Sequence, residues 1–157
     1  MGFPKSTGER LIIMTWTPHI TVASVVPHED RFLMVEEWST ERLVINQPAG
    51  HLDPDESLQA AAVRETLEET GWNTRVTHVI GLYLHLADNG TTYLRTCFLA
   101  ERIDHISQTL DEGIERAIWL TRDELIARSD QLRSPIVLQC IDDYLNGCRY
   151  PLSLVHS

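Results

Sequence analysis

One segment of the chain, residues 50–72, restricts the fold more than any other. It joins a polar loop to a helix that has a capping residue at each end. Ser57 is a favourable N-cap and Gly71 a favourable C-cap, so we expect a helix over residues 58–70. Runs of β-branched and apolar residues stand on both sides of this segment. A well-bounded helix set among strands predicts a fold of the α+β class.

Short runs rich in β-branched or apolar residues, separated by turn-forming residues, predict the strands. Pro27-His28-Glu29-Asp30 separates the first two runs and predicts a hairpin, and Asp88-Asn89-Gly90 predicts a turn between two later ones. The expected strands cover residues 19–26, 31–38, 43–47, 77–86, 92–101 and 116–120. Together they predict one mixed sheet.

Two further helices are expected near the C-terminal end. Thr121 and Glu124 match the T-x-x-E capping box at the start of one helix. Ser134-Pro135 predicts an N-cap followed by proline in the first turn of the other, which ends at Gly147. The expected sheet is therefore covered by helices.

The length of 157 residues fits one domain with its own core. We expect residues 1–17 to form an N-terminal arm, with a short strand over residues 11–14, and residues 18–157 to form a single domain. The three cysteines are odd in number and show no C-x-x-C spacing, which favours reduced thiols over disulfides or a zinc site.

The charge and hydropathy of the chain exclude several classes of partner. A formal net charge of −10 opposes binding to nucleic-acid polymers, whose phosphates require basic surfaces. No apolar run reaches the ~18 residues of a membrane span, and the first residues lack the pattern of a secretory signal. We therefore expect a cytoplasmic protein with a small-molecule partner. A phosphorylated substrate is compatible with the negative charge, since a metal can supply positive charge locally.

Three glutamates crowd one face of the central helix. At about 100° per residue, Glu65, Glu68 and Glu69 fall within a ~100° arc on neighbouring turns. Like charges at these spacings destabilise a helix by ~0.2–0.5 kcal/mol per pair, so the arrangement favours a compensating cation. A hard divalent metal with oxygen ligands fits. The alternative is a solvated helix face, which is the usual meaning of a run of charge.

Glu56 and Arg64 accompany this cluster. Glu56 precedes the N-cap, and from that loop it can fold back towards the three glutamates. Arg64 is spaced to pair with Glu68 on the helix or to reach Glu56, and either contact holds a carboxylate in a working rotamer.

The same residues carry a family resemblance. Gly50, Glu56, Arg64-Glu65, Glu68-Glu69 and Gly71 spell G-x5-E-x7-R-E-x-x-E-E-x-G, which resembles the Nudix box of the Nudix hydrolase superfamily. Thr66 departs from the pattern, because this position is usually given to a bulkier aliphatic residue. Over residues 18–154 the chain is also similar to bacterial Nudix phosphatases of the NudJ type. The segments that carry this similarity are PHITVASVV, NQPAGHLDPDESL, YLR, LRSP and RYPL.

The resemblance implies the Nudix fold, a mixed sheet between helices in an α/β/α arrangement, and a hydrolase that uses Mg²⁺, with Mn²⁺ as a substitute. It implies that Glu65, Glu68 and Glu69, with Arg64, form the catalytic group. Glu68 and Glu69 are expected as metal ligands, while Glu65 is either a ligand or the base that deprotonates the attacking water. The backbone carbonyl of Ala49 is a further family-type ligand.

In this family another acidic ligand often comes from a loop outside the box. Residues 111–115 are the corresponding region here, and Glu112 and Glu115 are the alternatives within it. An ordinary exposed carboxylate is an equally good interpretation of either residue.

Four residues are expected to contact the substrate: Gln47, His51, Arg95 and Arg133. Arg95 alternates with apolar neighbours on a strand, where its fork of donors suits a phosphate or a surface ion pair. Arg133 lies in the loop before the last helix. Gln47 and His51 flank the start of the box, and His51 is also suited to fixing the loop by a hydrogen bond.

The NudJ-type resemblance implies release of inorganic phosphate from nucleoside di- and triphosphates and from the pyrimidine pyrophosphate precursor of thiamine. In such a site Trp38 and Tyr93 either stack on the base or pack in the core. The alternatives are a Nudix pyrophosphatase for nucleotide-sugars or dinucleotides, and a module of the same fold that binds a phosphorylated ligand without hydrolysing it. Since all box glutamates are present, catalysis is favoured over the binding module. A monomer and a homodimer are both compatible with the sequence.

Overall fold

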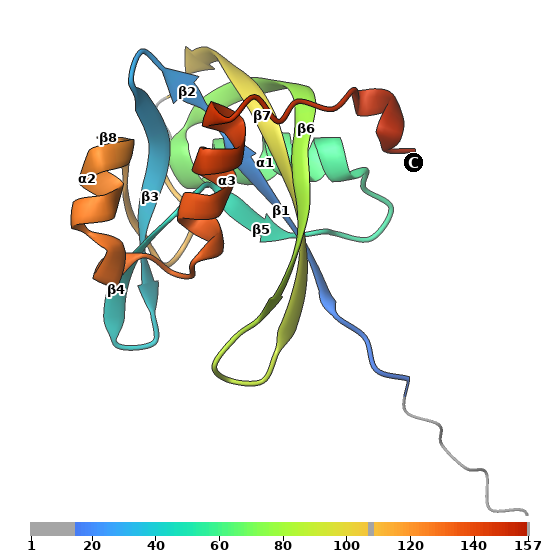
Figure 1. The fold of residues 1–157 in the computed structure, drawn as a ribbon, viewed down its shortest axis with the longest axis horizontal. Coiled ribbons are helices and arrows are strands. Elements are labelled where there is room, and N and C mark those ends of the chain that lie inside the picture. The colour runs from blue at the N-terminus through green and yellow to red at the C-terminus, as the bar shows by residue number, and fades with distance from the viewer. Residues whose placement is uncertain (1–14, 107–108, 157) are drawn as a thin grey trace, which may run out of the picture.

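The structure, a computed structural model, describes residues 15–106 and 109–156, and its strands form two sheets (Figure 1). The first sheet contains β1 (His19–Val25), β5 (Ala49–His51), β6 (Trp72–Leu86) and β7 (Thr92–His105). The second contains β2 (Pro27–His28), β3 (Arg31–Ser39), β4 (Arg42–Asn46) and β8 (Ile114–Thr121). The helices are α1 (Leu58–Thr70), α2 (Arg122–Ala127) and α3 (Ile136–Leu145), with short 3-10 turns η1 (Ser129–Gln131) and η2 (Leu152–Leu154). The strand predicted for residues 11–14 lies outside the described residues.

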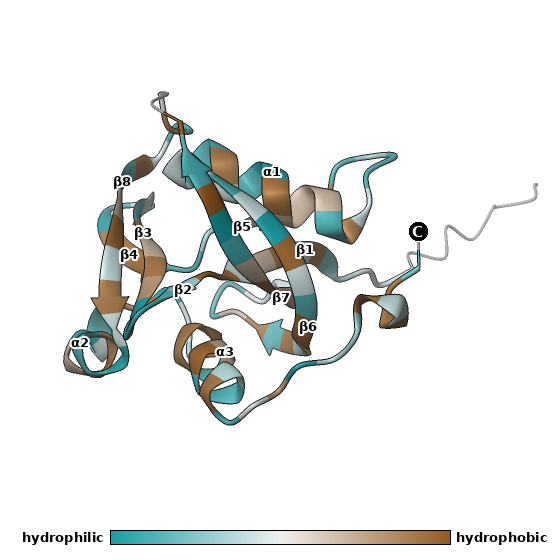
Figure 2. Ribbon diagram, turned by 90° about the horizontal axis from the view of Figure 1, so that it is seen from above, coloured by the Kyte–Doolittle hydropathy of each residue, from teal (hydrophilic) through white to brown (hydrophobic). Residues whose placement is uncertain are grey.

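The first sheet is mixed and is covered on both faces by helices. Its order is β5-β1-β7-β6, in which β1 and β7 run parallel and the other neighbours antiparallel. α1 lies on one face and α3 on the other in both views (Figures 1 and 2). Successive residues of β1 serve the two sides: Val22 belongs to the core cluster of Ala61 and Ala62, and Ala23 to that of Val137 and Cys140. The predicted sandwich of a mixed sheet between helices is confirmed.

The second sheet is antiparallel, so the prediction that all the strands form one mixed sheet is wrong. β3 pairs with β4 and β8, and the two-residue β2 pairs with the beginning of β3. The predicted hairpin between β1 and β3 is therefore wrong, because β1 pairs with β5 and β7 in the other sheet. The chain crosses between the sheets near Val26, whose carbonyl accepts the Leu33 N–H at 3.0 Å. Alternation of apolar residues identifies strands but not their partners.

The predicted ends of α1 are confirmed. The Ser57 hydroxyl accepts a hydrogen bond from the Ala60 N–H at 3.1 Å. Gly71 takes the left-handed conformation, with a φ of 75°, and its N–H donates to the Leu67 carbonyl at 2.8 Å. Both caps lie where the sequence places them, because capping depends on residues within one turn of the helix end.

The two later helices begin in different ways. Thr121 and Glu124 form both hydrogen bonds of the predicted capping box of α2. In α3 the cap position falls on Pro135, so the prediction that Ser134 caps this helix with its side chain is wrong. Since Pro135 is already in the helical conformation, the Val137 N–H donates to the backbone carbonyl of Ser134 instead. None of the described helices is long and apolar enough to span a membrane.

Thr66, the departure from the box pattern, lies at the buried contact between α1 and β1. Its hydroxyl donates to the Ala62 carbonyl at 2.7 Å and lies 3.0 Å from the hydroxyl of Ser24. Both side chains are fully buried. A polar residue is therefore accommodated at this position, because its hydroxyl finds partners within the helix and on the strand.

Candidate active site

Arg64 binds together the acidic residues at the start and the middle of α1. Its Nε and Nη2 contact the two carboxylate oxygens of Glu56 at 2.8 and 2.9 Å. Its Nη1 contacts Glu65 at 2.8 Å and Glu68 at 3.0 Å, and Nη2 also donates to the backbone carbonyl of His51 at 3.1 Å. The two contacts that the sequence gives as alternatives, to Glu68 and to Glu56, are thus both made. One guanidinium fork fixes the loop and two helix carboxylates.

Glu56 anchors the loop rather than joining the other glutamates. The hydrogen bond from Arg64 holds the pKa of Glu56 below its usual range, and the same contact raises the pKa of Arg64. The second Glu56 oxygen also accepts the Asp53 N–H at 3.2 Å. Glu56 therefore stays ionised as the fixed end of the Arg64 network.

A cluster of three carboxylates forms where α1 meets the loop before β8. One oxygen each from Glu65, Glu68 and Asp111 lies within 4.8 Å of the others. The Asp111 N–H donates to the Glu68 carbonyl at 3.0 Å, which holds the loop against the helix. The structure thus places Asp111 in the cluster and leaves out Glu112 and Glu115, the two residues that the sequence favours in this loop. Glu115 instead accepts the Trp38 indole N–H at 3.0 Å.

Gly50 makes room for the carboxylate of Glu65. A Cβ atom at position 50 would lie 2.1 Å from the Glu65 carboxyl carbon, which is far inside van der Waals contact. The absence of a side chain at this position therefore allows Glu65 to pack over the backbone of β5. This is a steric reason for the first glycine of the box, and no turn conformation is needed to explain it.

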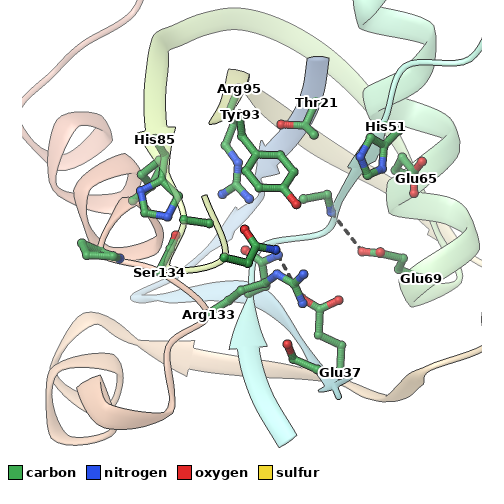
Figure 3. A pocket seen from close by; sticks show the side chains of 18 of the residues that line it. Thr21, Glu37, His51, Glu65, Glu69, His85, Tyr93, Arg95, Arg133 and Ser134 are labelled. Carbon is green, nitrogen blue, oxygen red and sulfur yellow. Dashed lines mark hydrogen bonds and ion pairs between the residues drawn. The ribbon is translucent and has the colours of Figure 1, made fainter. Parts of the chain in front are cut away.

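Glu69 is the most deeply buried of the box glutamates, with 7% of its surface exposed. One of its oxygens accepts the Ala49 N–H at 2.9 Å (Figure 3). Burial raises the pKa of Glu69 to about 9, and the charges of Glu37, Glu65 and Asp111 add to the effect. Burial also raises the pKa of Glu65. Without a nearby cation this region therefore disfavours negative charge.

A cavity of about 660 Å³ opens beside these glutamates, between the two sheets. Glu65, Glu69, Ala49 and Gly50 lie at its border towards α1. Figure 3 shows Thr21, Tyr93 and Arg95 on the side of the first sheet, with Glu37 and Arg133 on the opposite side. The volume is within the range of sites for small molecules.

Arg95 reaches the cavity with support from Gln47. The Gln47 side-chain oxygen accepts from Arg95 Nη1 at 3.3 Å, and its amide nitrogen donates to the Val137 carbonyl at 2.6 Å. Gln47 is fully buried and is not among the lining residues. The sequence-based expectation that Gln47 contacts substrate is thus corrected: its side chain lies behind Arg95 and orients it.

The other residues expected to contact the substrate do not all lie at the cavity. Arg133 lines the cavity and pairs with Glu37 at 3.3 Å. His51 and Tyr93 also line it, with ring centroids 6.4 Å apart. Of the two aromatic residues considered for stacking, only Tyr93 is placed at the cavity, whereas Trp38 is exposed on β3 and is not among the lining residues.

Comparisons with known proteins show the family of this chain. A model of the NUDIX domain matches residues 17–140. The phosphatase NudJ of Escherichia coli strain K12 is 41% identical over 140 residues, which cover 88% of this chain and 90% of that protein. A NUDIX hydrolase from Nitrosomonas europaea is similar in structure, with a TM-score of 0.88 and 42% identity over 90% of this chain and 97% of that one. A UDP-X diphosphatase, at 17% identity, shares the fold with a TM-score of 0.71 over 87% of this chain and 67% of its own.

The domain match spans most of the chain, and it includes the complete box, from Gly50 on β5 to Gly71 at the end of α1, and the residues that Arg64 holds together. The chain therefore belongs to the Nudix hydrolase family, whose members hydrolyse phosphorus-containing anhydrides.

Proposed function

We propose that this protein is a divalent-metal-dependent phosphatase of the NudJ type that hydrolyses phosphoanhydride bonds in small phosphorylated metabolites. The observation that carries the proposal is the carboxylate cluster of Glu65, Glu68 and Asp111, set at the border of a cavity of about 660 Å³. Glu65 belongs to the cluster and also lines the cavity. A cation held there would meet the phosphates of a ligand in the cavity.

The residues of the cluster fit a divalent cation. Carboxylate oxygens are the ligands that Mg²⁺ and Mn²⁺ prefer, and burial raises the pKa of Glu65, a member of the cluster. Glu69, which the sequence predicts as a ligand, lies outside this group of three. We assign Glu65, Glu68 and Asp111 as ligands, with the Ala49 carbonyl as a further candidate. Mg²⁺ held by these residues would neutralise phosphate charge and acidify a coordinated water.

Glu69 is the proposed acceptor of the proton from the attacking water. The Ala49 N–H fixes one of its oxygens. Burial raises the pKa of Glu69 to about 9 when no cation is present, so this residue can act as a base only once a cation at the neighbouring cluster favours its ionised form. Glu65, which is also buried, is the alternative base. Arg64 acts as a positioning residue, because its contacts hold Glu65 and Glu68 without reaching into the cavity.

The cavity offers groups for the rest of the substrate. Arg95 is the proposed phosphate-binding residue, held in place by Gln47, and Arg133 and His51 are further contacts. The identity to a protein named as a phosphatase supports release of inorganic phosphate. The proposed substrates are nucleoside di- and triphosphates and the pyrimidine pyrophosphate precursor of thiamine.

We also propose that the protein acts in the cytoplasm on free metabolites. The three cysteines are free, as is usual in a reducing compartment. The net charge of −10 opposes nucleic-acid polymers as substrates.

Phosphate release from a panel of nucleoside di- and triphosphates, with Mg²⁺ and with EDTA, tests the proposal. Glu68→Gln removes one carboxylate of the cluster. Glu112→Gln is the matched control, since Glu112 is an exposed carboxylate beside Asp111 that lies outside the cluster. We expect Glu68→Gln to lower kcat by about 100-fold or more with no change in thermal unfolding, and the control to match the native protein. Undiminished turnover in Glu68→Gln, or equal rates in EDTA, would reject the proposal.

The products separate the alternatives. A pyrophosphatase for nucleotide-sugars or dinucleotides releases a nucleoside monophosphate rather than inorganic phosphate. A binding module retains the ligand and yields no product.

A further inference from the structure

The backbone of Thr40 is strained. Among the residues that the structure describes, three that are not glycine have a positive φ, namely Glu29 at 55°, Thr40 at 57° and Asp55 at 63°. Thr40 is the β-branched one of the three, and a branched Cβ is poorly compatible with this conformation. Strained backbone of this kind persists where the surrounding structure enforces it, and it is concentrated at functional sites.

The turn between β3 and β4 imposes this conformation. Ser39 and Arg42 are paired, so the hairpin closes through only two residues, Thr40 and Glu41. Two-residue hairpin loops place a positive φ at their first position, which glycine adopts most easily. Within residues 15–106 and 109–156 the Thr40 side chain makes no hydrogen bond that would compensate for the strain. Folding alone therefore gives no reason for a threonine here.

Thr40 is exposed and lines the cavity of about 660 Å³. Glu37, whose charge acts on Glu69, lies three residues earlier, so at ~3.3 Å per residue Thr40 is about 10 Å from it. Figure 1 shows the β3–β4 and β6–β7 hairpins projecting to the same end of the molecule, away from α1. Residues of both turns line the cavity. The two turns thus border the end of the cavity that is remote from the carboxylate cluster.

The groups at these two turns suit a sugar better than a phosphate. Of the described turn residues that line the cavity, none is basic, whereas Asp88 carries a carboxylate. A carboxylate accepts hydrogen bonds, and a threonine hydroxyl both donates and accepts them. A ligand group at this end must therefore donate hydrogen bonds and carry no negative charge, as sugar hydroxyl groups do.

We propose that Thr40 is a specificity residue whose hydroxyl binds the sugar of a nucleotide substrate at the end of the cavity remote from the carboxylate cluster. The strain at this position is retained because glycine, which the turn favours, would lose that contact. The inference rests on the proposed function only in placing the phosphates of the nucleotide at the carboxylate cluster.

Equilibrium binding of AMP and of inorganic phosphate, measured by calorimetry in Mg²⁺, tests the inference. AMP contains the sugar and phosphate lacks it, and neither has an anhydride bond, so the measurement is independent of turnover. The native protein should bind AMP more tightly than phosphate. In Thr40→Gly we expect AMP to bind about fivefold more weakly, the effect of losing one hydrogen bond, with phosphate affinity unchanged. The melting temperature of this variant should be at least that of the native protein, because glycine relieves the strain.

Glu29→Gly is the matched control. Glu29 is the first residue of another two-residue hairpin loop, where His28 pairs with Arg31, and it is not among the residues that line the cavity. This variant should keep the AMP affinity of the native protein.

Three results would overturn the inference: equal affinities of the native protein for AMP and phosphate, an unchanged AMP affinity in Thr40→Gly, or a lower melting temperature in that variant. Phosphate release from nucleotides together with any of these results overturns the inference alone. Weaker AMP binding in Thr40→Gly, in a protein that releases no phosphate, overturns only the proposed function.

Discussion

Replacing Glu69 by glutamine separates the electrostatic cost of this residue from its packing. The side chain is 7% exposed, and the oxygen that accepts the Ala49 N–H at 2.9 Å has a counterpart in the glutamine carbonyl. The substitution therefore removes the titrating group with almost no change in shape or hydrogen bonding.

The size of the effect follows from the pKa of Glu69. Its value is about 9 in the folded protein and 4.5 as the ordinary value of the unfolded chain. The folded state thus binds the proton more tightly, so the contribution of Glu69 to stability is complete below pH 4.5 and is lost as the pH rises towards 9. Each pH unit in this interval corresponds to ~1.4 kcal/mol, so between pH 6 and pH 8 the free energy of unfolding falls by on the order of 3 kcal/mol.

Urea unfolding followed by tryptophan fluorescence at these two pH values, in EDTA, measures the effect. We expect the stability advantage of Glu69→Gln over the native protein to grow by on the order of 3 kcal/mol from pH 6 to pH 8. Excess Mg²⁺ should shrink the advantage, because a cation lowers the cost of the ionised carboxylate. A stability difference that is the same at both pH values would refute the reasoning, since Glu69 would then titrate alike in the folded and unfolded states.

Three further substitutions have distinct expected outcomes. Gly50→Ala places a methyl group on the Glu65 carboxylate, so we expect a higher Mg²⁺ requirement and about tenfold lower kcat with little change in melting temperature. Arg64→Lys cannot reproduce the fork, and kcat at saturating substrate should fall about tenfold or more in a folded protein. Thr121→Ala removes the side-chain cap of α2 from the capping box with Glu124. The free energy of unfolding, measured in urea, should fall by about 1 kcal/mol, and kcat should not change.

The parts of the molecule that depend on neighbouring residues could be predicted from the sequence. The bounds of α1, both of its caps and the reach of Arg64 to Glu56 and Glu68 follow from helical spacing and cap chemistry. The capping box of α2 is of the same kind. These features need no knowledge of the tertiary structure, because the interacting groups lie within a few turns of one another.

The parts that depend on distant pairing could not be predicted. Asp111 joins Glu65 and Glu68 because its loop docks on α1 through a backbone hydrogen bond, and nothing in the sequence distinguishes it from Glu112 one position later. Gln47 is buried by α3, whose Val137 carbonyl it meets 90 residues later. The division into two sheets depends in the same way on strand partners that alternation does not identify.

The attachment of α3 to the cavity connects ligand binding to the local unfolding of the C-terminal region. The Arg133 N–H donates to Ile45 at 2.9 Å, and the contact of Gln47 with Val137 extends to Arg95. Undocking of α3 would release both arginines, so any anion bound by them must oppose that opening by mass action. Amide hydrogen exchange along α3 should therefore slow when the cavity is filled, although the helix is covalently distant from the box.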